Sequence, residues 1–192
     1  MSNTDAEHAR THTRPGALAR PVRAEDSMAD LTILLHRAYR KQVEMGLRPL
    51  AGRQTEDITR ARIHSGEAFV AELRGRLVGM ILLNEKEDAA FPPHFQKPGV
   101  SHFSLFAVDP ECQGQGIGRA LLDAAETRAR ILGFNDFALS MAEPDQELLN
   151  FYLRLGFRFV EHWQWPYTNY RSVILTRPIG PPEHAPTDPH RR

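Results

Sequence analysis

One segment near the middle of the chain limits its fold more than any other. An apolar, strand-like run over residues 100–108 is followed by glycines at 114, 116 and 118, and then by a helical pattern from about residue 116 to 132. Glycine lets the backbone approach a ligand closely, and the first amides of a helix lack intrahelical acceptors. The segment predicts a central strand, an anion-binding turn and a helix. The alternative is a turn that is glycine-rich only because its packing is tight.

Two common phosphate-binding motifs do not fit this turn. A P-loop needs Gly-Lys-Ser/Thr, but Arg119 and Ala120 follow Gly118. The dinucleotide fingerprint needs a third glycine where Arg119 stands, counting from Gly114. The sequence of the turn therefore argues against a P-loop protein and against a dinucleotide-binding protein of this type.

The pattern around the turn predicts an α/β fold with a mixed sheet. Asp26 or Ser27, Thr55 and Asp145 are candidate N-caps, each followed by a helical pattern. The predicted strands occupy 19–23, 68–73, 77–83, 100–108, 136–141, 157–163 and 170–176, with hairpins at 68–83 and 157–176. Along 100–108, strict alternation places Phe103, Leu105 and Ala107 on one face and His102, Ser104, Phe106 and Val108 on the other.

Composition predicts one domain between two tails. Residues 1–18 are polar, and 178–192 hold five of the fourteen prolines, so both segments are expected to be disordered. The domain is then 19–177. With 24 basic and 24 acidic side chains the net charge is zero, which argues against nucleic acid and anionic membranes as partners.

The single cysteine, Cys112, excludes an intrachain disulfide and suits a cytoplasmic protein. No apolar run is long enough to span a bilayer, and no secretory signal is recognised. His8 and His12 have a metal-like spacing but lie in a tail without a third ligand, so no metal is expected. The sequence leaves a homodimer open.

The turn resembles the Gln/Arg-x-x-Gly-x-Gly/Ala signature of the GNAT superfamily of acetyl-CoA-dependent N-acetyltransferases. Here it reads Gln-Gly-Gln-Gly-Ile-Gly over 113–118, and the likeness extends over about 20–177. The resemblance implies a mostly antiparallel sheet of six to seven strands, a central splayed parallel pair and helices on both faces. A bulge at Val108-Asp109-Pro110 would suit that splay.

The same resemblance assigns the site that binds acetyl-CoA, the co-substrate. The turn's amides would bind the CoA pyrophosphate, and the backbone at the end of the preceding strand would hold the pantetheine arm. The pyrophosphate residues are Gln113, Gly114, Gln115, Gly116, Ile117, Gly118 and Arg119, and the pantetheine residues are Phe106, Ala107 and Val108.

A second motif points the same way. Tyr152 precedes Leu155-Gly156-Phe157 at the spacing of the family's Tyr-x-x-Leu/x-Gly-Phe motif, whose tyrosine lies near the CoA sulfur and often acts as general acid. A half-buried core aromatic is the alternative. The family often has an asparagine seven residues earlier, where this chain has Asp145, so that residue is expected to be only a helix cap.

An amine acceptor must lose a proton before it attacks. His102 is the candidate general base because its ordinary pKa suits the task, and a structural histidine is the equal alternative. Glu143 is a weaker candidate. Cys112 is interpreted as a bystander.

The acceptor side carries weaker signals. Trp163, Trp165, Tyr167 and Tyr170 could line an acceptor pocket, although packing is the commoner role of such residues. Acidic residues within 84–111 and 143–147 could attract a cationic amine.

The predicted function is transfer of an acetyl group from acetyl-CoA to a primary amine of a small molecule, peptide or protein, by direct attack in a ternary complex. Residues 39–60 and 84–99 are expected to set the acceptor, whose identity the sequence does not give. A non-catalytic acyl-CoA-binding regulatory module and a nucleotide-phosphate binder are the alternatives.

Overall fold

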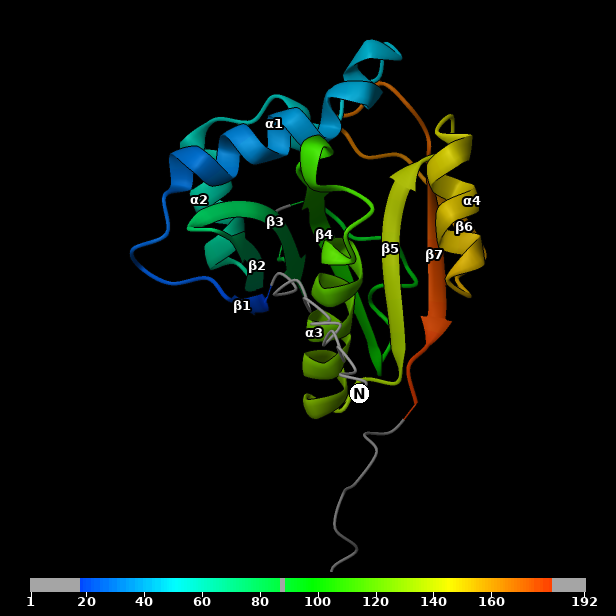
Figure 1. Cartoon of the computed structure of the whole chain (residues 1–192). Helices are drawn as coiled ribbons and strands as arrows, with labels where there is room; N and C mark the ends of the chain where they lie inside the picture. Colours follow the sequence, from blue (N-terminus) through cyan, green and yellow to red (C-terminus); the bar gives the residue numbers. More distant parts are fainter. Residues whose placement is uncertain (1–17, 87–88, 181–192) are drawn as a thin grey trace, which may run out of the picture.

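The computed structural model describes residues 18–86 and 89–180. In these residues a seven-stranded sheet has the order β1-β2-β3-β4-β5-β7-β6, with helices on both faces (Figure 1). The strands are β1 (Leu18–Pro21), β2 (Glu67–Leu73), β3 (Arg76–Leu83), β4 (Val100–Val108), β5 (Asp136–Ala142), β6 (Arg158–Trp163) and β7 (Ser172–Pro178). The helices are α1 (Met28–Glu44), α2 (Glu56–His64), α3 (Ile117–Ile131) and α4 (Gln146–Arg154).

Side-chain caps begin three of the helices at predicted positions. Ser27 accepts from the amide of Asp30 at 3.1 Å, and Thr55 accepts from that of Ile58 at 3.3 Å. Asp145 caps α4 in the same way. These bonds satisfy amides that a helix cannot satisfy itself, which is why Ser, Thr and Asp mark the starts.

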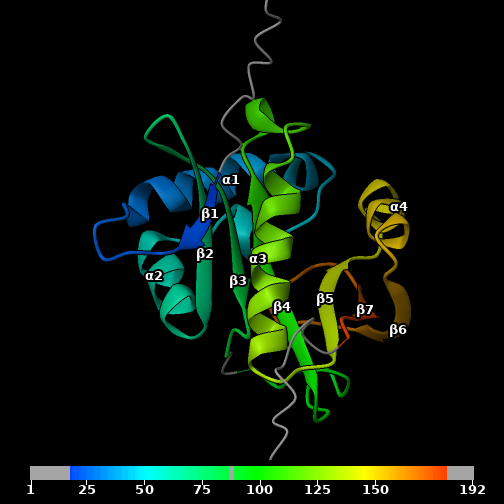
Figure 2. The ribbon, with the colours of Figure 1, turned by 60° about the horizontal axis from the view of Figure 1, so that its bottom comes forward.

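The sheet separates two apolar clusters. On one face α1 and α2 bury Leu31, Leu35 and Ile63 against the strands. On the other, α3 crosses the sheet and buries Leu121 and Ala125 together with α4 (Figure 2). The predicted mixed sheet with helices on both faces is therefore confirmed.

The parallel pair at the centre of the sheet is only partly joined. β4 and β5 pair from Val100 opposite Asp136 to Phe103 opposite Leu139. Beyond that point, residues 104–108 of β4 and 140–142 of β5 are not paired with one another, and the strands diverge (Figure 1). This is the predicted splay, which we call the split.

A β-bulge interrupts the pairing of β4 with β3. On β3, Met80 and Leu82 are two residues apart, but their partners on β4, Ala107 and Ser104, are three apart. The extra residue coincides with Leu105, whose φ is +48°, and not with Val108-Asp109-Pro110, where a bulge would have suited the split.

The bulge also changes which side chains share a face of β4. Phe103 lies in the α3 cluster with Phe106 and Val108, whereas Leu105 and Ala107 lie in the α1 cluster. The predicted grouping was therefore wrong, because strict alternation assumes a regular strand.

The packed chain continues past the predicted boundary at residue 177. β7 extends to Pro178, Ile179 is 5% exposed, and its carbonyl accepts from Arg130 Nε at 2.6 Å. At the other end β1 already begins at Leu18. The remainder of the two predicted tails lies outside the described residues.

Candidate active site

The glycine turn joins the free end of β4 to α3. Asp109 accepts from the amide of Glu111 at 3.0 Å and so starts a short 3-10 turn, Pro110–Cys112. Gly114 and Gly116 then adopt φ values of +73° and +80°, which side chains with a Cβ rarely adopt. Gly118 packs closely instead, because a Cβ there would lie 3.3 Å from the ring of Phe106, which would have to shift slightly.

The backbone of this turn fits an anion. Among the described residues, the amides of 113–119 have no hydrogen-bond acceptor, although Gln113 donates a side-chain bond to the carbonyl of Val108 at 3.4 Å. Arg119 is paired with Asp123 at 3.0 Å within α3. A phosphate here would therefore meet backbone amides and a helix N-terminus. The seven predicted pyrophosphate residues, 113–119, lie in this turn and in the first turn of α3.

Residues 106–108, predicted to hold the pantetheine arm, border the split. Their outer edge pairs with β3, but the edge toward β5 has no strand partner. An extended ligand could therefore hydrogen-bond to this backbone from within the split.

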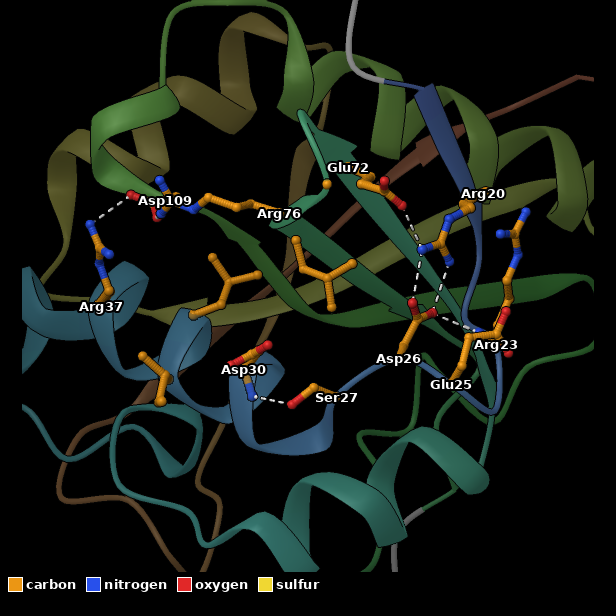
Figure 3. Close-up of a pocket in the computed structure, with 14 residues that line it drawn as sticks. Arg20, Arg23, Glu25, Asp26, Ser27, Asp30, Arg37, Glu72, Arg76 and Asp109 are labelled. Carbon is orange, nitrogen blue, oxygen red and sulfur yellow. Dashed lines mark hydrogen bonds and ion pairs between the residues drawn. The ribbon is translucent and has the colours of Figure 1, made fainter.

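A cavity of about 500 Å³ lies beside α1 and the β2–β3 turn (Figure 3). Several of its charged side chains pair with one another: Arg20 with Asp26 at 2.8 Å and with Glu72 at 2.9 Å, and Arg37 with buried Asp109 at 3.0 Å. Much of the charge that lines the cavity is therefore held in internal ion pairs. The Arg37–Asp109 pair ties α1 to the start of the glycine turn.

A smaller cavity of about 110 Å³ lies at the split, and rings form a large part of its wall. We call it the acceptor cavity. It brings together residues from β4, β5, α1 and three loops that are far apart in the sequence. The rings that line it are Tyr39, Phe91, Phe95, His102, Phe103, Trp165, Tyr167 and Tyr170.

His102 lies in the wall of this cavity. Its Nε2 is 3.1 Å from the carbonyl oxygen of Glu85, and its ring stacks on Phe95 at 4.5 Å. Because a carbonyl can only accept, Nε2 carries the proton and Nδ1 keeps a lone pair. Burial lowers the pKa of His102, so the ring is neutral at neutral pH.

Tyr152 lies on the other face of the sheet, toward α3. Its ring is 6.2 Å from that of Phe103, the last residue of β4 that pairs with β5, and 5.6 Å from that of Phe157. Burial, with smaller effects from Tyr39 and Asp145, raises its pKa well above the ordinary value. The hydroxyl is therefore protonated, and Tyr152 and His102 lie on opposite faces where the split begins.

The remaining candidate residues, Asp145, Glu143 and Cys112, make other contacts in the fold. Asp145 caps Leu148 at 3.1 Å and accepts from Gln42 of α1 at 3.0 Å, so both carboxylate oxygens are used. Glu143 forms a two-bond pair with Arg171 at 2.6 and 2.8 Å, which lowers its pKa. Cys112 packs against the α3 cluster as a half-buried apolar side chain.

The sequence indicated the two acceptor segments but not the side chains within them. Tyr39, Glu85, Phe91, Phe95 and Ser104, which also line the cavity, were not predicted as site residues. Of the four aromatic residues proposed for the pocket, Trp165, Tyr167 and Tyr170 line it, whereas Trp163 does not. Local patterns cannot show that segments far apart in the sequence meet in space.

Comparison with known proteins agrees with the fold and the turn. The model of the acetyltransferase (GNAT) family matches residues 28–157. The S-(2-succino)cysteine N-acetyltransferase of Bacillus subtilis is 30% identical over 70% of this chain and 79% of its own length. Rat N-acetyltransferase 8F1 is 29% identical over 64% of this chain, and the match spans 56% of that longer protein.

Among solved structures, a GNAT family acetyltransferase from Elizabethkingia anophelis with acetyl-CoA bound has a TM-score of 0.60 at 17% identity, covering 86% of this chain and 99% of its own. The split sheet and the strand–turn–helix unit are thus those of the GNAT fold. This chain belongs to the acetyltransferase (GNAT) family.

The described residues contain neither a metal-ligating cluster nor a membrane-spanning helix. In residues 18–86 and 89–180, no group of three His, Cys, Asp or Glu side chains could hold a metal ion. Within the same ranges no helix has the length and apolarity to cross a membrane. His8 and His12 lie outside them.

Proposed function

We propose that this protein transfers the acetyl group of acetyl-CoA to an amine bound in the acceptor cavity, by direct attack in a ternary complex. The observation that carries the proposal is the split, which has unpaired amides at one end and a histidine-lined cavity where β4 leaves β5. The acetyl-CoA pyrophosphate binds at 113–119, and the pantetheine arm follows 106–108 into the split.

In this mechanism the thioester lies between His102 and Tyr152. An incoming ammonium first loses one proton to solvent through His102. The neutral nitrogen attacks the carbonyl carbon, and its second proton passes to His102 as the C–N bond forms. The C–S bond then breaks with its electron pair on sulfur, and Tyr152 donates the proton that completes CoA-SH. Solvent returns the proton of His102 to the tyrosine, so one proton is released overall.

The charge of the cavity argues for an acceptor recognised by shape and hydrogen bonds. The predicted acidic attraction is weaker than expected, because Glu85 is paired with Arg62 and Glu143 with Arg171. Glu87 and Asp88 lie outside the described residues. An amine on a small apolar or aromatic group fits the ring-lined wall.

The test is acetyl-CoA consumption over a panel of amines. The panel includes S-(2-succino)cysteine, named for the Bacillus subtilis relative, together with aromatic amines and short peptides. We expect turnover with at least one primary amine, and thermal stabilisation by acetyl-CoA greater than by ATP or NAD. Stabilisation without turnover would instead support the regulatory module, and no stabilisation at millimolar acetyl-CoA would refute the proposal.

A further inference from the structure

A buried carboxylate lies in the wall of the acceptor cavity. Glu85 is 2% exposed, and Arg62 of α2 pairs with both of its oxygens, with Nη2 at 2.8 Å from Oε2. Arg62 in turn donates to Gln54 Oε1 at 2.9 Å. A buried ion pair adds little net stability compared with apolar packing, so stability alone does not explain this one.

The carboxylate orients Ser104. The Ser104 hydroxyl is hydrogen-bonded to Glu85 Oε2. Because a carboxylate paired with a guanidinium only accepts, the serine must donate its one proton to it. The lone pairs of Ser104 Oγ are then left to accept a hydrogen bond from the cavity, which Ser104 lines.

The same residue orients His102 through its main chain. The carbonyl of Glu85 fixes the proton of His102 on Nε2 and leaves Nδ1 as an acceptor. His102 and Ser104 flank Phe103, where β4 and β5 separate. Glu85 thus sets two hydrogen-bond acceptors beside the place where the acceptor nitrogen must attack.

We propose that Ser104 is an amine-binding residue, that Glu85 and Arg62 position it, and that Ser104 and His102 together select primary amines over their N-methyl derivatives. The proposal rests on the function proposed above. A neutral primary amine has two N–H groups for the two acceptors, and its lone pair stays free for the thioester. A secondary amine leaves one acceptor unpaired, and an unsatisfied buried polar group is costly.

The first test compares a primary amine that the enzyme acetylates with its N-methyl derivative. Wild type should prefer the primary amine at least about tenfold in kcat/KM. Ser104→Ala should raise KM for the primary amine about five- to tenfold and reduce that preference, while Kd for acetyl-CoA stays within about twofold. Ser104→Thr, which keeps a hydroxyl, should recover most of both losses.

Ser101→Ala is the matched control. Ser101 lies on the joined part of β4, is fully buried and donates to the carbonyl of Asp136 at 3.2 Å. Its removal should leave KM and the preference within about twofold of wild type. If Glu85 acts through Ser104, Glu85→Gln should reduce the preference in wild type but not in Ser104→Ala.

The outcomes separate the two proposals. If Ser104→Ala keeps the wild-type KM and preference while primary amines are acetylated, the inference is refuted and the proposed function stands. A wild-type protein that binds acetyl-CoA but acetylates no amine would overturn both.

Discussion

Replacing Gly116 by alanine tests the glycine turn. The ideal Cβ at Gly116 has no atom within 4 Å, so the substitution meets no steric obstacle, but φ is +80°. Holding alanine in that left-handed conformation costs about 1–2 kcal/mol. For a domain of this size, that lowers Tm by roughly 2–8 °C. Because Gly116 also caps α3, a new methyl group and a shifted backbone should disturb the amides that face the anion.

Gly133 supplies the matched control at the other end of the same helix. Its φ is +87°, and its ideal Cβ also has no atom within 4 Å. Gly133→Ala should therefore lower Tm by about the same amount as Gly116→Ala. Only Gly116→Ala should weaken acetyl-CoA binding, by about 10- to 100-fold, if one charge-assisted hydrogen bond to phosphate is lost. Scanning calorimetry gives Tm, and titration calorimetry gives Kd. Equal Kd values for the two variants would refute an anion site at 113–119.

Three further predictions concern proton transfer. Tyr152→Phe keeps the ring against Phe103 but removes the hydroxyl, so kcat should fall about 10²- to 10⁴-fold while calorimetry shows an unchanged Kd for acetyl-CoA; an undiminished kcat would remove Tyr152 from the mechanism. Burial disfavours the His102 cation, so the acidic limb of kcat/KM should have its midpoint below 6.5, the ordinary pKa, and His102→Asn should abolish that limb. A midpoint of the acidic limb at or above 6.5 would exclude His102 as the base. Because the unfolded chain binds the His102 proton more readily than the folded protein does, the free energy of unfolding should also fall as the pH drops below 6.5. Glu143→Gln breaks a partly exposed pair with Arg171, so kcat/KM should stay within about twofold of wild type; a large loss would return Glu143 to the list of bases.

The regular elements and their ends could be predicted because they follow local rules. Ser27, Thr55 and Asp145 are residues that cap helices, and Gly114 and Gly116 do occupy positive φ. The hydrophobic periods of 100–108 and 117–131 reflect burial on two faces and on one stripe. Each of these signals depends on residues within one or two turns of each other.

The bulge at Leu105 could not be predicted, because no residue that favours positive φ marks its position in the sequence. A leucine at φ +48° gives no sign in the sequence, and the bulge is visible only in the pairing of β4 with β3. Its effect was large, since one extra residue reassigns the face of every later side chain in β4.

The side chains that line the acceptor cavity could not be predicted for a related reason. Glu85 reaches Arg62 and Ser104 only because α2, the end of β3 and the middle of β4 meet in space. The charge of Glu85, counted along the sequence, suggested attraction for a cation, but its partner cancels it. Conversely, the rings at 165 and 167 form part of a real wall, in which Trp165 donates to Ser140 at 2.9 Å and stacks on Tyr167.

The wall formed by residues 165–172 has a consequence for how such proteins diverge. Asn169 fastens this segment to the chain after α1, by bonds of 2.8 Å to the amide of Arg48 and 2.9 Å to the carbonyl of Gly46. The segment lies beyond residue 157, where the match to the family ends. The shared part of the sequence therefore holds the turn and the split, while one side of the acceptor cavity comes from outside it. If the acceptor cavity binds the amine as proposed, changes confined to this C-terminal segment would alter the amine that fits without altering the parts proposed to bind the acyl donor.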